Sequence, residues 1–293
     1  AEENRSEIVE ALRDADLVFI TAGLGGGTGT GAAPIVAEAA REAGALTVAV
    51  VTKPFTFEGS QRIKIAQDGL ARLKDKVDTL VVVPNDRIFG IIDKNTSLIK
   101  AFQAIDDVLR NAVQAVTELL IIPGLVNVDF ADIKAVMKDA GSAIIGVGVA
   151  AGGDRSLKAV TAAVNSSLLE LSIEGAKGVL FCVSGRDLKM AEINEIAKTI
   201  SETIDQGAKI IFGAYHDRKL KPGQLKVTLI ATGFNGILAR PMTSLFASAD
   251  AEKIKVEPVL ASFDKTSGSK TAKNQKQSSD IWDIPAFMRR RKR

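Results

Sequence analysis

A nine-residue run with six glycines is the feature that most constrains the fold of this chain. It reads Gly-Leu-Gly-Gly-Gly-Thr-Gly-Thr-Gly and occupies positions 23–31. The apolar stretch 17–22 before it is typical of a buried strand, and residues 32–43 after it have helical spacing, with Pro34 in the expected first turn. Glycine permits positive φ and close approach of a ligand, and the N–H groups of a helix N-terminus attract anions. The run therefore predicts an anion site between a strand and a helix.

Two familiar phosphate motifs do not fit this run. A Walker loop needs a lysine, and none lies between Val18 and Val51; the dinucleotide pattern Gly-x-Gly-x-x-Gly started at Gly25 meets Thr30 where it needs a third glycine. A flexible linker is the remaining alternative, although linkers rarely lie between a buried strand and a capped helix.

Length and composition favour a soluble protein of two domains. The chain has 293 residues, of which 46% are hydrophobic, and no apolar run reaches the ~18 to 20 residues that span a bilayer. We therefore expect a cytosolic protein without a transmembrane segment. The single cysteine, Cys182, lies in an apolar run and reads as a core residue, and the single histidine, His216, reads as a strand-end or surface residue. This composition leaves no Cys/His metal cluster.

The basic charge belongs to the C-terminal end. Residues 239–293 hold 12 of the 38 basic and 6 of the 35 acidic residues, which leaves 26 basic and 29 acidic residues before them. Because the part with core-forming patterns is mildly acidic, we expect no specific nucleic-acid partner.

Further polar residues follow the next two predicted strands. Residues 45–51 form a continuous apolar run that is followed by Glu58 and Arg62, with Ser60 as a candidate cap for a helix to residue 73; the strand 80–84 ends at Asn85. Ligands of parallel α/β sheets gather at the carboxyl ends of the strands, so these side chains and the glycine run should converge. An i,i+4 surface ion pair between Glu58 and Arg62 explains the spacing equally well.

One long amphipathic helix is predicted over Ser97–Leu120. Its apolar residues recur at alternating spacings of three and four: Leu98, Phe102, Ile105, Leu109, Ala112, Val116 and Leu119. Asp106 adjoins this stripe, whereas Asp107 fits a solvated face. After the helix comes Asn127-Val128-Asp129-Phe130-Ala131-Asp132, in which Asp129 suits an N-cap and Asp132 a first helical turn. By themselves, these residues favour capping over catalysis.

The remaining chain predicts an α/β scaffold and then a tail. Strands are expected at 143–149, 178–184, 208–215 and 225–232, and helices at 2–15, 154–171 and 187–205, the last with Met190 inward. Residues 239–279 read as a linker, whose part from 265 has the composition of disordered chain. The apolar residues of Asp280–Met288 have no core to join, so we expect them to dock in a partner's groove, with the basic cluster 289–293 as a secondary contact.

The glycine run, with Ile-Thr-Ala-Gly before it and Ala-Ala-Pro after it, resembles the signature loop of the tubulin/FtsZ family of GTPases. The resemblance implies an α/β fold: a tubulin-like GTPase domain with a parallel Rossmann-like sheet, a long central helix, a second α/β domain and a disordered C-terminal tail. The corresponding boundaries are 1–96 for the GTP-binding domain, 97–120 for the helix, 121–238 for the second domain, 239–279 for the linker and 280–293 for a partner-binding peptide. The family also implies an upstream glycine-rich unit, which nothing here matches, so the chain looks N-terminally truncated.

The same resemblance implies the site. GTP would be bound by Gly25, Gly26, Gly27, Thr28, Gly29, Thr30, Gly31, Glu58 (ribose), Arg62 (phosphates), Asn85, Phe102 (base stacking) and Asp106 (guanine edge). Because a carboxylate can accept from both N1–H and the exocyclic amine of guanine, Asp106 suits GTP rather than ATP. Asn127, Asp129 and Asp132 would form an acidic loop that acts on the nucleotide of the neighbouring subunit. Mg²⁺ would be bound mainly through the nucleotide phosphates, without a protein metal site.

The function implied is that of a self-assembling GTPase of the bacterial division ring, cytoplasmic and placed at the mid-cell septum. Its partners would be further copies of itself in a head-to-tail polymer, and membrane-tethering and regulatory division proteins that bind Asp280–Met288. Two other readings are a nucleotide-binding enzyme that is active as a monomer and a tubulin-like structural filament that binds nucleotide without efficient hydrolysis.

Overall fold

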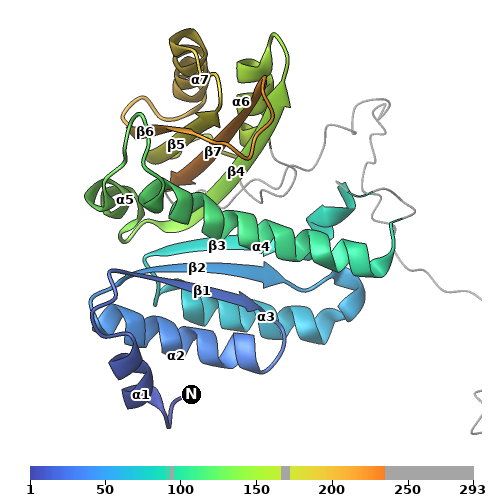
Figure 1. Cartoon of the computed structure of the whole chain (residues 1–293). Helices are drawn as coiled ribbons and strands as arrows, with labels where there is room; N and C mark the ends of the chain where they lie inside the picture. The colour runs from blue at the N-terminus through green and yellow to red at the C-terminus, as the bar shows by residue number, and fades with distance from the viewer. Residues whose placement is uncertain (91, 93–95, 166–171, 235–293) are drawn as a thin grey trace, which may run out of the picture. The chain divides into compact units, whose positions relative to one another are not determined.

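The structure is a computed structural model that describes residues 1–90, 92, 96–165 and 172–234 (Figure 1). All of these residues belong to one compact unit. The predicted linker and the C-terminal peptide Asp280–Met288 lie outside the described residues.

One seven-stranded sheet runs through the described chain, in the order β1-β2-β3-β4-β7-β5-β6. The first four strands are parallel, β7 is antiparallel to both of its neighbours, and β5 and β6 are parallel. The strands are β1 (Leu17–Gly23), β2 (Leu46–Lys53), β3 (Thr79–Pro84), β4 (Gly141–Ala151), β5 (Gly178–Gly185), β6 (Lys209–His216) and β7 (Gln224–Thr232). The strands of both predicted domains therefore share one sheet.

Helices cover both faces of the strands β1 to β3 (Figure 1). Alternate residues of β2 show why: Val48 and Val50 pack with α4, whereas Ala49 and Val51 pack with α2 and α3. A strand buried on both faces must be apolar throughout, which explains the continuous run in β2. The helices are α1 (Arg5–Ala11), α2 (Thr28–Glu42), α3 (Ser60–Lys74), α4 (Leu98–Ile121), α5 (Phe130–Met137), α6 (Arg155–Val164) and α7 (Met190–Thr203), with short 3-10 helices η1 (Thr56–Glu58) and η2 (Asn85–Gly90).

The C-terminal strands are covered in the same way. Helices α6 and α7 pack on one face, where Val160, Ile196 and Ile200 meet Phe181 and Val227. Helix α5 packs on the other face through apolar side chains that include Ile133 and Met137, and this core is continuous with that of α4. Cys182 is buried in it, and burial raises the pKa of its thiol to about 12, as expected of a core cysteine. His216 is exposed at the end of β6, as predicted.

Three predictions about helix starts were wrong. Helix α2 begins at Thr28 rather than near 32, so Pro34 lies in its second turn, because tertiary packing overrides the low helix propensity of Gly29 and Gly31. Gly59, with a φ of 97° that favours glycine, is the N-cap of α3 in place of Ser60. Met190 is 77% exposed because it is the first residue of α7 and precedes the turns that face the core.

Other helix boundaries were predicted too long. Helix α1 is limited to Arg5–Ala11, and α7 to Met190–Thr203. Of the helix expected at 154–171, the structure describes Arg155–Val164, and residues 166–171 lie outside the described part. No helix in the described ranges is both long enough and apolar enough to span a bilayer.

Candidate functional site

The glycine loop connects β1 to α2 through a tight set of backbone contacts. The N–H of Leu24 donates to the carbonyl of Thr52 at the end of β2, at 2.9 Å. Gly25 has a φ of +102°, a left-handed conformation that glycine adopts without strain, and its N–H donates to Thr30 Oγ1 at 2.8 Å. The loop is therefore held in one shape by its own threonine and by the neighbouring strand.

Close approach and open space alternate along this loop. A Cβ on Gly29 would lie 2.3 Å from the carbonyl oxygen of Gly23, which no side chain can tolerate. At Gly26, Gly27 and Gly31, by contrast, a Cβ would meet no other described atom within 4 Å. The first N–H groups of α2 have no partner within the helix, as a phosphate cradle requires.

Glu58 and Arg62 lie beside the glycine loop and also form an ion pair. Arg62 Nε is 3.0 Å from a carboxylate oxygen of Glu58, whose other oxygen accepts a hydrogen bond from the N–H of Phe55 at 2.8 Å. A Cβ on Gly25 would lie 2.9 Å from Arg62 Cγ, so the arginine stem contacts the loop. The two interpretations of this pair are therefore compatible: the side chains pair with each other at the edge of the cradle.

The carboxyl end of β3 contributes Asn85, which begins η2. Its Oδ1 atom is buried and has no hydrogen-bond partner among the described residues. The adjacent Asp86 accepts hydrogen bonds from the N–H and the hydroxyl of Thr56, and so ties η1 to η2. A buried acceptor without a partner costs free energy unless a ligand donates to it, which fits a polar ligand at this edge.

An aromatic cluster adjoins these loops. The buried ring of Phe55 is stacked on Phe57 at 4.7 Å, lies 5.5 Å from Phe89 and meets Phe102 edge-on at 5.9 Å. Phe102, which the sequence placed in the apolar stripe of α4, is 46% exposed. Asp106 follows one helical turn later and is exposed. Phe55, Phe57 and Phe89 carry no sequence signal of such a cluster beyond their positions after the ends of β2 and β3.

The acidic loop is fixed onto β6. Asn127 Oδ1 accepts from the N–H of Gly124 at 2.6 Å, and Val126 forms a β-bridge with Ala214. Asp129 occupies the N-cap position of α5, but its carboxylate makes no capping hydrogen bond to the described helix. Asp132 lies in the first turn. The position predicted for Asp129 is confirmed, whereas the capping bond is not, so the carboxylate is available to an external group.

The glycine loop and the acidic loop lie at opposite ends of α4. In Figure 1, β1 passes into α2 at the right-hand end of the sheet, and α5 lies at the left-hand end. The 24 residues of α4 form a helix about 36 Å long, at 1.5 Å per residue, that runs between these two ends. The structure thus brings Arg62, Glu58 and Asn85 to the carboxyl edge with the glycine loop, and it does not bring Asp129 or Asp132 to that edge.

This arrangement can bind an anionic ligand with a planar ring. No group of three or more His, Cys, Asp or Glu side chains that could hold a metal ion occurs in the searched residues, which are the described ones. The cradle of N–H groups and the Arg62 guanidinium suit a phosphate. The exposed ring of Phe102 suits stacking on a base.

Comparison with protein families gives two matches. The model of the Tubulin/FtsZ family GTPase domain matches residues 1–93, and that of the FtsZ family C-terminal domain matches residues 141–235. The two matches flank α4 and the acidic loop.

Solved structures are similar over most of the chain. An empty FtsZ dimer from M. jannaschii is 49% identical, with a TM-score of 0.75 over 80% of this chain and 68% of that chain. A point mutant of FtsZ from the same organism is also 49% identical, with the same TM-score and with 80% and 70% covered. CetZ2 from Haloferax volcanii, solved as a GTPgS-bound protofilament, is 20% identical with a TM-score of 0.63 over 78% of this chain and 70% of that chain, a likeness of fold alone.

Proposed function

Because the chain belongs to the FtsZ family, we propose that it is a GTPase that assembles head-to-tail into filaments of the division ring and hydrolyses GTP between neighbouring subunits. The observation that carries this proposal is that the glycine loop and the acidic loop lie at opposite ends of α4. Asp129 and Asp132 cannot reach a nucleotide held at the glycine loop of their own chain, so they would act on that of another subunit.

The glycine loop would hold the phosphates of GTP. Its open N–H groups and the N-terminus of α2 would bind the oxygens of the triphosphate, and Arg62 would add a positive charge beside them. Glu58 would contact the ribose, and Asn85 Oδ1 would accept a hydrogen bond from the nucleotide. Phe102 would stack on the base, and Asp106 would accept from the guanine edge.

The acidic loop would supply the groups that act on water. Asp129 and Asp132 would orient and polarise a water molecule for attack on the γ-phosphate, with Asn127 holding the loop in shape. Mg²⁺ that enters with the nucleotide would neutralise phosphate charge. The chain's own contribution is the position of these carboxylates, which the bridge between Val126 and Ala214 fixes.

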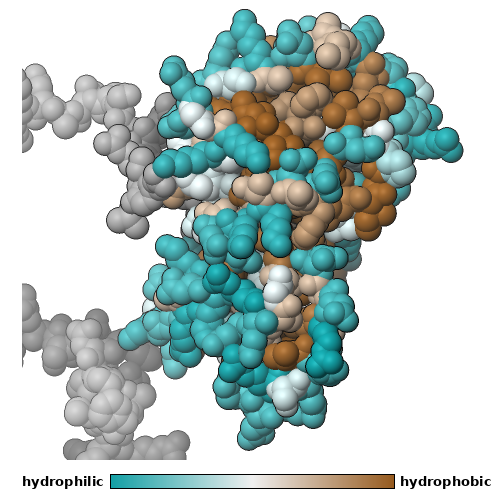
Figure 2. Space-filling model, turned by 90° about the vertical axis from the view of Figure 1, so that its left-hand side faces the viewer, coloured by the Kyte–Doolittle hydropathy of each residue, from teal (hydrophilic) through white to brown (hydrophobic). Residues whose placement is uncertain are grey.

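Exposed apolar side chains lie beside the acidic loop and support contact with a second copy. They come from the end of α4 and the segment that follows it: Ile121, Leu125 and Val126. Figure 2 shows apolar surface over the C-terminal half of the chain on the face turned to the viewer. If this end binds the nucleotide end of the next subunit, the contact is heterologous, and a heterologous contact whose rotation does not close a ring produces filaments.

The dependence of GTP turnover on protein concentration tests the proposal. If the site is shared, turnover per subunit should rise with concentration and level off once filaments form. A flat profile would favour an enzyme that is active as a monomer. Filaments without turnover would favour a structural protein that binds nucleotide without efficient hydrolysis.

The C-terminal peptide, which lies outside the described residues, would connect the filament to the membrane. Ile284, Pro285 and Phe287 would fill a groove on a tethering protein, since proline lowers the entropy cost of ordering the peptide. Phe287→Ala should weaken binding to the tether by ~2 kcal/mol or more while GTP turnover is retained. If Phe287→Ala binds normally but neutralising Arg289–Arg293 abolishes attachment, the tail is an electrostatic membrane contact instead. In either case, we propose that the filament lies in the cytoplasm at the division septum.

A further inference from the structure

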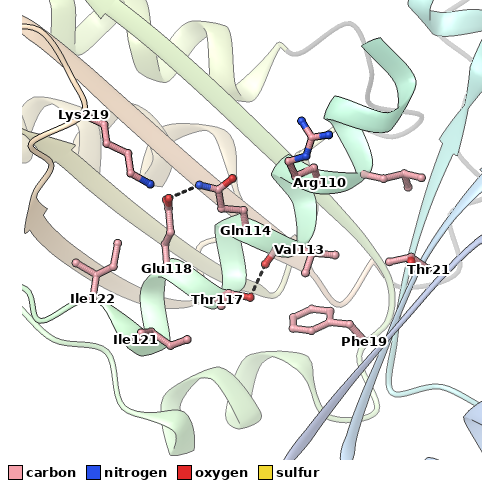
Figure 3. A pocket seen from close by; sticks show the side chains of 11 residues that line it. Phe19, Thr21, Arg110, Val113, Gln114, Thr117, Glu118, Ile121, Ile122 and Lys219 are labelled. Carbon is pink, nitrogen blue, oxygen red and sulfur yellow. Dashed lines mark hydrogen bonds between the residues drawn. The ribbon is translucent and has the colours of Figure 1, made fainter. Parts of the chain in front are cut away.

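A buried polar network holds the last turn of α4 against the C-terminal strands. One carboxylate oxygen of Glu118 accepts hydrogen bonds from the Tyr215 hydroxyl at 2.7 Å and from Lys226 Nζ at 2.8 Å, and the other accepts from Gln114 Nε2 at 2.6 Å. The side chains of Glu118 and Lys226 are 12% and 17% exposed. Figure 3 shows Glu118 and Gln114 joined along α4, at the wall of a cavity of about 670 Å³ that Lys219 also lines.

The network remains charged at neutral pH. Burial raises the pKa of the Glu118 carboxyl, but the hydrogen bonds from Lys226, Tyr215 and Gln114 outweigh burial and hold the pKa below its ordinary value. Burial and the bond to Glu118 raise the pKa of Tyr215 to about 12, so its hydroxyl remains a donor. Charge-assisted hydrogen bonds of this kind are about twice as strong as neutral ones.

The same strand that supplies Tyr215 holds the acidic loop. The carbonyl of Ala214 accepts from the N–H groups of Leu125 and Val126 at 2.7 and 3.1 Å, and its N–H donates to the carbonyl of Val126 at 3.0 Å. The loop lies so close to β6 that a Cβ on Gly213 would be 2.9 Å from Val128 Cγ2. The loop is thus attached to β6 next to the point where Glu118 attaches α4 to β6.

We propose that Glu118, Tyr215 and Lys226 are positioning residues for hydrolysis: by fixing the last turn of α4 to β6 and β7, they set where Asp129 and Asp132 stand. This inference rests on the proposed function of the acidic loop. Helix α4 ends at Ile121, three residues after Glu118, and leads directly into the segment that carries the acidic loop, so a shift of its last turn would move the loop relative to β6. Small displacements of groups that orient a nucleophile reduce rates strongly.

Three variants of the full-length protein separate positioning from folding. Tyr215→Phe removes one hydroxyl from the network, Lys226→Met removes the charge, and Lys226→Arg restores a cation. Ser156→Ala is the matched control, because it removes a buried hydroxyl that donates to Glu195 from α6, on the far side of the sheet from the acidic loop. For each variant we would measure GTP turnover at saturating protein, GTP affinity, and amide hydrogen exchange of residues 122–132.

The expected result is a turnover about tenfold lower in Tyr215→Phe and Lys226→Met, with GTP affinity unchanged and faster exchange confined to residues 122–132. Lys226→Arg should recover most of the turnover. Unchanged exchange in the loop would overturn the inference, as would an equal loss of turnover in Ser156→Ala. If the unsubstituted protein hydrolyses no GTP, the proposed function fails, whereas the loop exchange still decides whether this network holds the loop.

Discussion

Gly29 and Gly23 are in such close contact that a Cβ on Gly29 would lie 2.3 Å from the carbonyl oxygen of Gly23. Gly29 lies in the first turn of α2, and Gly23 is the last residue of β1, so the backbone of neither residue can move away easily. Gly29→Ala should therefore push α2 away from β1, lower the free energy of unfolding by about 1–3 kcal/mol and weaken GTP binding. Urea denaturation and nucleotide titration would measure both effects.

Gly31→Ala is the matched substitution for stability. It lies in the same helix, and its added Cβ would meet no other described atom within 4 Å. Replacing glycine by alanine inside a helix should raise the free energy of unfolding by about 0.5–1 kcal/mol. Equal stability losses at both positions would show that close contact is not what requires Gly29.

Asp106 should determine the preference for guanine. Asp106→Asn leaves one acceptor where the guanine edge offers two donors, so GTP affinity should fall on the order of tenfold to a hundredfold. The neighbouring Asp107 is paired with Arg110 on the exposed face, and Asp107→Asn should leave the affinity unchanged. Equal dissociation constants for the two variants would remove Asp106 from the base site.

Removing the polar side chain of Arg155 should lower the free energy of unfolding strongly, because Arg155 is the buried centre of an ion-pair network in the C-terminal half. Its side chain is 4% exposed, and its guanidinium donates to Glu192 at 2.7 and 2.9 Å and to Asp187 at 2.8 Å. Arg155→Met leaves these carboxylates without their partner and should cost about 3 kcal/mol of unfolding free energy. The exposed pair Lys198–Glu202 provides the comparison, since Lys198→Met should cost under about 0.5 kcal/mol.

The Arg155 network also predicts a pH dependence. Hydrogen bonds from Arg155 are the main cause that lowers the pKa of Asp187 and of Glu192 below their ordinary values of 3.8 and 4.5. A lowered folded-state pKa adds stability above the ordinary value, and this contribution is lost as the pH falls through the folded-state pKa. The stability difference between the unsubstituted protein and Arg155→Met should therefore narrow as the pH falls from 6 to about 3. A constant difference across this range would contradict the assignment.

The sequence predicted the elements whose signals are local. Apolar runs such as that of β2 identified the strands, and the spacing of Ile105, Ala112 and Val116 identified α4, since burial on a sheet imposes these periods. It did not predict the antiparallel insertion of β7 between β4 and β5, because strand order depends on contacts between distant segments. The early start of α2 was missed for a different reason: close packing of Gly29 on β1 outweighs its low helix propensity.

The candidate site was predicted in part. The glycine run, Glu58, Arg62 and Asn85 follow strand ends, and that rule places them at one edge of a parallel sheet. No such rule could identify the cluster around Phe55, or show that Asp129 stands at an N-cap without a capping bond. The sequence shows Glu118 only as a carboxylate between Val116 and Leu119, which are buried. Helical spacing alone would place the Glu118 side chain in solvent.

Asp132→Ala should separate hydrolysis from binding. Because Asp132 lies at the far end of α4 from the glycine loop, the variant should bind GTP normally, while turnover falls on the order of 10²-fold or more. Turnover, nucleotide affinity and filament sedimentation should be measured together. A stability loss of ~1 kcal/mol with near-normal turnover would instead mean that Asp132 serves only the helix terminus.

The measurement that tests the shared site most directly is GTP turnover in an equal mixture of Asp106→Asn and Asp132→Ala. Asp106→Asn has a defective nucleotide pocket, and Asp132→Ala has a defective acidic loop. The GTP concentration would be chosen so that only the intact pocket is filled. If the site forms between subunits, roughly a quarter of the contacts in a mixed filament combine an intact pocket with an intact acidic loop. The mixture should then hydrolyse GTP at roughly that fraction of the unsubstituted rate, well above either variant alone. A mixture that shows only the mean of the two separate rates would contradict a site shared between subunits.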